Sequence, residues 1–187
     1  RTFAMKHFVL VLLAIIALTS MAKRGQVYLS SKNKYDYKNL LQTKGGASVL
    51  VPLADGVEEL EAVTIIDILR RAGAQVTIAS VGQGSLVSGA NGISLNADTS
   101  IQSAISQEFD LIVLPGGSEG AKNLAQSKEL IEKLKKQRDA GKWYAAICAS
   151  PAVVLYPNGL LQDRDATCYP SYAEKYSDFD WSSKNVV

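Results

Sequence analysis

The stretch from Val49 to Ser80, VLVPLADGVEELEAVTIIDILRRAGAQVTIAS, establishes the fold class of this chain. An apolar run at 47–52 and a second one at 75–80 are typical of buried strands. Between them, residues 56–72 carry apolar side chains at helical spacing and stop at a glycine. A strand, a helix and a second strand in this order predict two parallel strands with the helix packed on one face.

The same alternation continues along the chain. Residues 111–114 (LIVL) predict a third buried strand and residues 143–147 (WYAAI) a fourth strand, and residues 120–140 and 150–156 predict helices. Residues 82–96 are rich in Gly, Ser and Asn and predict a hairpin. We therefore expect an α/β protein with a mainly parallel sheet and helices on both faces. In such sheets, functional sites lie beyond the carboxyl ends of the strands.

Composition indicates one compact domain with a basic leader. The chain has 187 residues, of which 47% are hydrophobic and 20% charged, which excludes a disordered chain and a disulfide-stapled miniprotein. Residues 1–46 hold eight Lys or Arg and one Asp, a net charge of +7. The rest holds twelve Lys or Arg and 17 Asp or Glu, a net charge of −5, which argues against nucleic acid as a partner.

Residues 1–22 have the parts of a secretory signal peptide. Lys6 precedes an apolar run of 11 residues, 8–18, and Ser20 and Ala22 form a small-x-small cleavage site. A membrane span needs about 20 apolar residues, so we expect cleavage after Ala22 and no stable membrane insertion afterwards. An uncleaved signal anchor is the alternative.

Residues 23–46 form a basic extension with six basic residues and one acidic residue. We interpret it as an exposed linker of a secreted protein. A signal peptide followed by a basic, acid-poor stretch is also the layout of a two-part plastid targeting leader. The chain is thus predicted to enter the secretory pathway and to be secreted or, alternatively, delivered to a plastid.

Cys148 is the candidate nucleophile. It directly follows the predicted strand 143–147 and precedes a helix with Pro151 in its first turn, which is the position of a nucleophile elbow. The free N–H groups of a helix start favour a thiolate and predict a thiol pKa below the usual value of about 8.5. The same groups, including that of Ala149, can bind an oxyanion. A buried structural cysteine is the alternative.

Glu61 is the candidate acid–base partner. On a helical wheel it falls within the apolar stripe of the predicted helix, whereas Glu59 lies on the other side. Burial raises the pKa of a carboxyl group, so a protonated Glu61 can donate to a Cys148 thiolate or act as a general acid–base. The alternative is a carboxylate that supports the helix dipole, a role that Glu58 and Glu59 fit better.

Two further features accompany these candidates. Gly116 and Gly117 follow a predicted strand and form a loop that can approach a ligand closely, or simply end the strand. Cys168 lies in a possible strand, 166–169, and is interpreted as structural, with a disulfide to Cys148 left open.

Two classes of site are excluded by composition. The single histidine, His7, lies in the predicted signal peptide, so one mature chain cannot form a Cys-His or Ser-His-Asp arrangement. The sequence has no Cys/His set typical of zinc and no glycine fingerprint for phosphates or dinucleotides. We therefore expect neither a metal nor a cofactor.

Three segments together resemble the ThiJ/PfpI superfamily, on its parkinsonism-associated deglycase branch. They are the opening stretch quoted above, FDLIVLPGG at 109–117 and AAICASPAVVL at 145–155, and the resemblance covers 47–187. It implies a flavodoxin-like three-layer sandwich, like that of class I glutamine amidotransferases, and a homodimer. By motif, the family's reactive cysteine falls on Cys148 and its thiolate-bonding glutamate on Glu61.

The resemblance also implies a reaction. It points to a cysteine-dependent, cofactor-free glyoxalase or deglycase acting on methylglyoxal-type α-oxoaldehydes or early glycation adducts. Cys148 is then the nucleophile and Glu61 the acid–base, and N–H groups near Gly116, Gly117 and Ala149 bind the oxyanion. The alternative is a redox-sensing or chaperone-like protein that uses oxidation of Cys148. An amidotransferase- or peptidase-like member is less favoured.

The chain departs from the family pattern in three places. Relatives on this branch often carry His before the Pro of the segment 167–170, where this chain has Tyr169, an accessory candidate beside Cys168. Protease-like members carry His directly after the nucleophile, where this chain has Ala149. The chain stops at Val187, about where a further family strand begins, so we expect the C-terminal part of the domain to be missing.

Overall fold

The computed structural model describes residues 46–184 and 186–187. The predicted signal peptide, 1–22, lies outside the described residues, and so does the basic extension except for Gly46. Within the described residues, no helix is long and apolar enough to cross a membrane.

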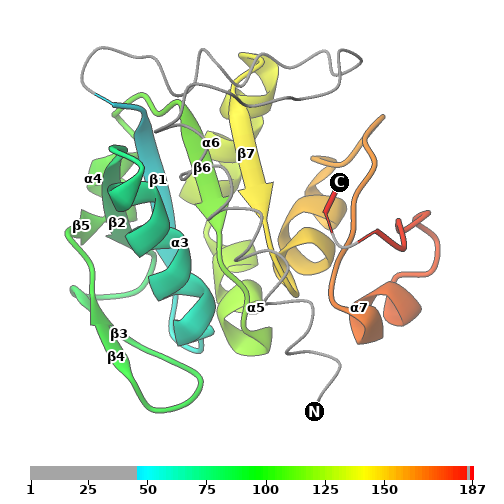
Figure 1. Cartoon of the computed structure of the whole chain (residues 1–187), viewed down its shortest axis with the longest axis horizontal. Coiled ribbons are helices and arrows are strands. Elements are labelled where there is room, and N and C mark those ends of the chain that lie inside the picture. Colours follow the sequence, from blue (N-terminus) through cyan, green and yellow to red (C-terminus); the bar gives the residue numbers. More distant parts are fainter. Residues whose placement is uncertain (1–45, 185) are drawn as a thin grey trace.

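A parallel sheet forms the middle layer of the domain (Figure 1). Its strands are β1 (Ser48–Leu53), β2 (Gln75–Ser80), β5 (Thr99–Ser100), β6 (Leu111–Leu114) and β7 (Trp143–Ala146). They pair in the order β5-β2-β1-β6-β7, and every pair is parallel. The α/β class and the parallel sheet expected from the alternation of elements are confirmed.

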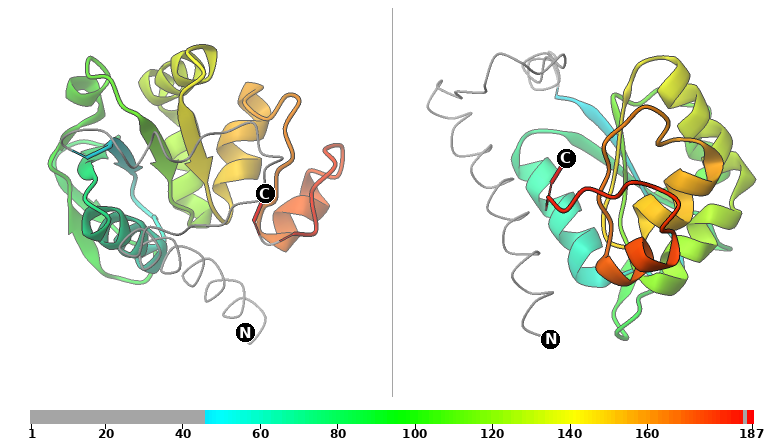
Figure 2. Two further views of the ribbon diagram at one scale, coloured as in Figure 1. Left: turned by 45° about the horizontal axis from the view of Figure 1, so that its top comes forward. Right: turned by 90° about the vertical axis from the view of Figure 1, so that its right-hand side faces the viewer.

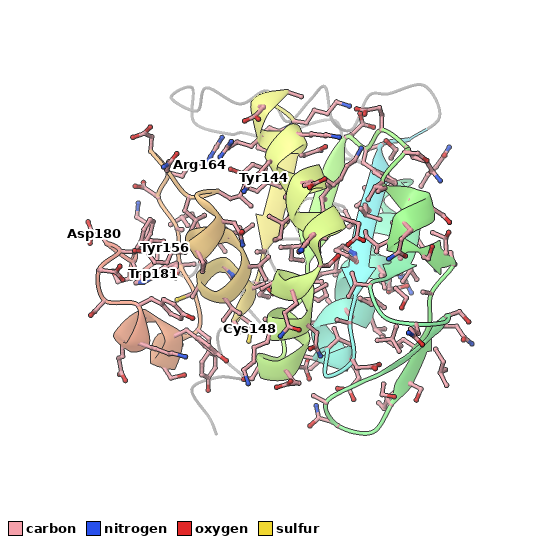
Figure 3. All side chains as sticks on the ribbon, turned by 180° about the vertical axis from the view of Figure 1, so that it is seen from behind. Tyr144, Cys148, Tyr156, Arg164, Asp180 and Trp181 are labelled. Carbon is pink, nitrogen blue, oxygen red and sulfur yellow. The ribbon has the colours of Figure 1, made fainter. Side chains whose placement is uncertain are left out.

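Helices cover both faces of this sheet (Figure 2). Helix α3 (Glu59–Arg71) packs on one face. On the other face lie α4 (Ile101–Ala104), α5 (Ser118–Gln126), α6 (Lys128–Asp139) and the helical segment 150–158 (Figure 3). The three layers agree with the expected flavodoxin-like sandwich.

Alternation along the strands divides the core between the two faces. Val49 and Val51 of β1 belong to the apolar cluster on the α3 side, which includes Ile66, whereas Leu50 belongs to the cluster on the opposite side, which includes Leu134 of α6. All five side chains are buried. Burial of this kind contributes about 25 cal/mol per Å² of apolar surface, and it fixes the strand register.

A hairpin extends past the carboxyl ends of the strands, close to the first turn of α3 (Figure 1). Its strands β3 (Leu86–Ser88) and β4 (Ser94–Asn96) pair antiparallel, as the composition of residues 82–96 predicts. The hairpin is bonded to the loop after β1, because Gly56 donates its N–H to the Ser88 carbonyl at 2.7 Å.

Two helices differ from what the sequence predicts. Helix α3 begins at Glu59 and not at residue 56, because Gly56 has a φ of 81° and Glu58 caps the helix. The predicted helix after Cys148 is a π-helix, Pro151–Leu155, followed by a 3₁₀-helix, Tyr156–Asn158.

The possible strand 166–169 is also wrong, because this segment is irregular. Its backbone hydrogen bonds go to non-strand partners instead of a ladder. Tyr169 donates to the Cys148 carbonyl at 2.8 Å, and the Ala166 carbonyl accepts from Ser182 at 2.8 Å. The short helix α7 (Pro170–Lys175) follows directly.

The strand order places a switch point at the centre of the sheet. Strand β1 has β2 on one side and β6 on the other, so the winding direction reverses between β1 and β6. Ligands of open α/β sheets bind beyond the carboxyl ends of the strands at such a point. The start of α3 and the loops after β6 and β7 meet there, and they carry Glu61, the glycine pair 116–117 and Cys148.

Candidate active site

Cys148 occupies a strained turn between β7 and the helical segment that follows it (Figure 3). Its φ is 62°, in the left-handed region that side-chain-bearing residues rarely adopt. The Ser150 N–H closes the turn on the Ile147 carbonyl at 3.1 Å, and Pro151 begins the π-helix. Such strain persists where the surrounding structure holds it, and it is concentrated at functional sites. The structure therefore places Cys148 at an elbow of the expected kind.

Glu61 reaches this elbow from the first turn of α3. Its side chain is buried, and its Oε2 accepts the N–H of Gly116 at 2.8 Å. Burial raises the pKa of Glu61 to about 7, and the negative charge of Glu58 acts in the same direction. The hydrogen bonds with the Gly116 N–H and with Cys148 lower the pKa of Glu61, but by less than burial raises it. Glu61 can therefore exchange a proton near neutral pH.

The Cys148 thiol does not have the lowered pKa that its position before a helix predicts. Burial and then the charge of Glu61 raise its pKa to about 12, and the opposing N–H groups of Gly117 and Ala149 are too weak to reverse this. The thiol is thus the resting form. Since the carboxyl group of Glu61 lies within hydrogen-bonding range of this thiol, it is placed to take the thiol proton.

Only glycine fits at position 116, because Cys148 and Glu61 leave no room there for a side chain. A Cβ at this position would lie 2.5 Å from both the Cys148 Cβ and the Glu61 Oε2, and 3.0 Å from the Cys148 Sγ. At Gly117, φ is 91° and a Cβ would overlap the Gly56 carbonyl oxygen. Both glycines therefore permit a close approach, and neither merely ends β6.

The elbow is tied to this glycine loop by a buried hydroxyl. Ser150 donates its Oγ–H to the Pro115 carbonyl at 2.6 Å, and the side chain is fully buried. Ala149 is also fully buried and presents only its backbone N–H to the site. Elbow, glycine loop and first turn of α3 thus form one connected unit.

The remaining candidates lie at the edge of the site. Tyr169 is 43% exposed and touches the elbow through its backbone N–H, which donates to the Cys148 carbonyl. Cys168 lies beside it in the irregular segment, and burial raises its pKa to about 11. Both cysteines are free thiols, so the disulfide left open by the sequence is not formed in this structure.

Glu59 is buried, which corrects its placement on the exposed side of the helix. The β3–β4 hairpin covers that side, and the carboxylate accepts from the Asn91 N–H at 2.6 Å, the Asn91 Nδ2 at 2.9 Å and the Ile93 N–H at 3.2 Å. Burial alone acts to raise the pKa of Glu59, but these hydrogen bonds together lower it to about 2. Gly89 has no Cβ that would collide with this carboxylate.

Sequence reasoning missed the role of this hairpin contact. Asn91 is one polar residue in a loop rich in Gly, Ser and Asn, and nothing in that pattern distinguishes it from its neighbours. The one available signal is Gly89, which marks a position where a side chain is excluded.

Two hollows in the described domain lie away from Cys148. One, of about 270 Å³, lies between α3 and the sheet and is lined by Leu53, Ile66 and Ile78 among others. The other, of about 520 Å³, lies beside Tyr156 and Phe179. Within residues 46–184 and 186–187, no group of three or more His, Cys, Asp or Glu side chains is placed to hold a metal ion.

A thiol at a strained elbow, paired with a buried carboxyl group at the switch point of a parallel sheet, defines a class of α/β proteins with a cysteine–carboxyl pair at the carboxyl edge of the sheet. The chain belongs to the DJ-1/PfpI family, whose model matches residues 47–187.

Relatives of known name share this part of the chain. It is 47% identical over 135 residues to protein DJ-1 homolog B of Arabidopsis thaliana, a match that covers 72% of this chain and 31% of that protein. The chain thus spans about a third of that relative. It is 30% identical over 141 residues to a Pyrococcus abyssi protein named a deglycase, covering 74% and 83% of the two chains.

The fold agrees with solved structures of the family. An oxidized DJ-1 of Toxoplasma gondii superposes with a TM-score of 0.71 at 43% sequence identity. The superposition covers 74% of this chain and 76% of that one.

Proposed function

We propose that the protein is a cysteine-dependent, cofactor-free enzyme of the glyoxalase or deglycase type. Its substrates would be methylglyoxal-type α-oxoaldehydes or early glycation adducts. The observation that carries the proposal is the pairing of the Cys148 thiol, at a strained elbow, with a buried Glu61 whose pKa is about 7. A group with a pKa near the working pH is the most effective acid–base catalyst.

The first step joins the sulfur to the aldehyde. Glu61 as carboxylate removes the proton of the Cys148 thiol while Sγ attacks the aldehyde carbon. The carbonyl oxygen becomes an oxyanion, and the N–H groups of Gly117 and Ala149, which point toward the sulfur, stabilise it. Glu61 then returns the proton to this oxygen, which gives a neutral hemithioacetal.

The second step moves hydrogen between the two carbons of the substrate. Glu61 removes the proton from the former aldehyde carbon and delivers it to the ketone oxygen, which gives an enediol. Glu61 then takes the proton of the hydroxyl on the sulfur-bearing carbon and delivers it to the neighbouring carbon, so that the C=O bond of the thioester forms. The product is a 2-hydroxy thioester on Cys148. Water then attacks the thioester, releases the hydroxy acid and restores the thiol, so that methylglyoxal plus water gives lactate with no net oxidation.

Loss of methylglyoxal in the presence of the full chain tests this proposal. We expect Cys148→Ala to abolish turnover and Glu61→Gln to reduce it by roughly 10²-fold or more, because proton transfer typically contributes 10²–10⁴-fold. Cys168→Ala is the matched control, since that thiol has no carboxyl partner in the site, and it should keep wild-type turnover. Undiminished turnover by Cys148→Ala would reject the mechanism.

A redox role of the same thiol is the second candidate. The related structure from Toxoplasma gondii is that of an oxidized DJ-1. Cys148 is partly accessible and lies beside Glu61, which could donate a hydrogen bond to a sulfinate. Intact-mass measurement after mild peroxide discriminates the two roles. A selective gain of two oxygen atoms on Cys148 in a protein without aldehyde turnover would favour the redox role.

We also propose that the protein acts as a homodimer. Large apolar side chains are exposed on the outer side of α3, at Leu60 and Val63, and on the hairpin, at Leu86 and Ile93. Exposed apolar surface next to polar surface is typical of a protein interface. A second copy of the chain is the partner that would cover it.

A further inference from the structure

Glu58 stands between the hairpin and the Glu61–Cys148 pair. One carboxylate oxygen, Oε2, accepts the backbone N–H of Glu61 at 2.8 Å and so caps α3. The other, Oε1, accepts from Asn91 Nδ2 at 3.4 Å. The backbone N–H of Glu58 donates to the Gly116 carbonyl at 3.1 Å. A single residue thus contacts the hairpin, the helix start and the glycine loop.

We propose that Glu58 is a positioning residue for the acid–thiol pair. Its carboxylate holds the first turn of α3 and places a negative charge beside Glu61, and Asn91 holds Glu58 in turn from the hairpin. The inference rests on the proposed function in that it takes Cys148 and Glu61 as the reactive pair.

The groups that face Glu61 come from three elements. Glu58 faces it from the N-cap of its own helix, the Gly116 N–H from the loop after β6, and the Cys148 thiol from the elbow after β7. Glu58 is the one whose charge can be removed without altering a reacting atom. Its ionised form disfavours a second negative charge at Glu61, so it helps to keep Glu61 protonated up to neutral pH.

Asn91 completes the arrangement from the hairpin tip. Its Nδ2 donates to both Glu58 and Glu59, and its backbone N–H donates to Glu59 as well. The hairpin is also anchored independently of this side chain, because the Ala90 N–H donates to the Val57 carbonyl at 2.8 Å. Loss of the amide therefore releases Glu58 without detaching the hairpin.

The test is the pH dependence of Cys148 alkylation by iodoacetamide, measured with the full chain. Alkylation requires the proton of the thiol to leave, so its rate should rise as Glu61 loses its own proton and becomes able to accept one. Wild type should show a midpoint near the Glu61 pKa of about 7. Glu58→Gln keeps an oxygen that can cap Glu61 but removes the charge, and it should move the midpoint down by about 0.5 pH unit or more.

Further variants separate positioning from fold maintenance. Glu58→Asp retains the charge and should leave the midpoint close to that of wild type, whereas Asn91→Ala should move it in the same direction as Glu58→Gln but less. The matched control is Glu129→Gln, an acidic residue in the first turn of α6 on the opposite face of the sheet. It should not move the midpoint.

The result that overturns the inference is a folded Glu58→Gln variant with the wild-type midpoint. A Glu58→Asp variant that shifts as far as Glu58→Gln would likewise reject the role of charge. Methylglyoxal turnover, measured in parallel, keeps the two proposals apart. If Glu58→Gln shifts the midpoint but wild type shows no turnover, the role of Glu58 is supported and the proposed enzyme is rejected. If the midpoint does not shift but wild type shows turnover, the role of Glu58 is rejected and the proposed enzyme is supported.

Discussion

Adding one methyl group at Gly116 should disable the site without replacing either member of the Cys148–Glu61 pair. The φ of Gly116 is outside the left-handed region, so alanine meets no backbone penalty, and the effect comes from packing alone. The new Cβ would lie 2.5 Å from the Cys148 Cβ and from the Glu61 Oε2. Ordinary contacts of this kind are near 3.5–4.0 Å, so the two groups must separate by about 1 Å.

The size of the effect follows from that displacement. Overpacking of this kind typically costs about 1–3 kcal/mol of stability. A misplacement of about 1 Å between reacting groups costs on the order of 10²-fold in rate. For Gly116→Ala we therefore expect about 100-fold slower methylglyoxal turnover. We also expect urea titration to show a free energy of unfolding that is lower by about 1–3 kcal/mol. Turnover by the folded variant should be measured well below its unfolding transition.

Gly82→Ala is the matched control, because a Cβ at Gly82 would meet only the Ser80 Oγ, at 3.8 Å. This variant should keep wild-type turnover, with a free energy of unfolding changed by less than about 0.5 kcal/mol. The packing argument fails if Gly116→Ala unfolds and turns over like Gly82→Ala, since the glycine would then not be needed for the approach of Glu61 to Cys148.

Three further predictions concern the same residues and the exposed face. Folded Glu61 has a pKa of about 7 against 4.5 when unfolded, so the native state holds the proton more tightly, and the free energy of unfolding should fall by about 3 kcal/mol as pH rises from 4.5 to 7. Urea titrations should show that Glu61→Gln flattens this slope; an unchanged slope would contradict a buried Glu61. Mild peroxide should add oxygen to wild type but not to Cys148→Ser by intact mass, and equal uptake by both would place the reactive sulfur elsewhere. Val63→Glu should convert the proposed dimer to a monomer in light scattering, and a wild type that is already monomeric would reject the proposed interface.

The fold was predictable because it depends on local patterns. Apolar runs bounded by glycine and proline mark β1, β6 and β7, and helical spacing marks α3. The elbow at Cys148 was predictable for the same reason, since a cysteine between a strand and a helix that begins with proline needs no distant contact to be recognised.

What the sequence could not predict depends on contacts between distant segments. The helical wheel places Glu59 on the polar side, but the hairpin residue Asn91, 32 positions later, folds over that side with its neighbours and buries it. The thiol pKa has a similar explanation. The helix start, a local feature, favours ionisation of Cys148, whereas burial by the whole fold and the charge of Glu61 oppose it more strongly. The thiol therefore needs a base, and Glu61 is the base that we propose.

The proposed enzyme depends on Cys148, served by Glu61, turning an α-oxoaldehyde into a hydroxy acid. The decisive experiment is the formation of lactate from methylglyoxal by the full chain between pH 5 and 8, with Cys148→Ala alongside. We predict a rate that rises with a midpoint near the Glu61 pKa of about 7 in wild type and no lactate from the variant. Equal lactate formation by the two proteins would contradict the proposal.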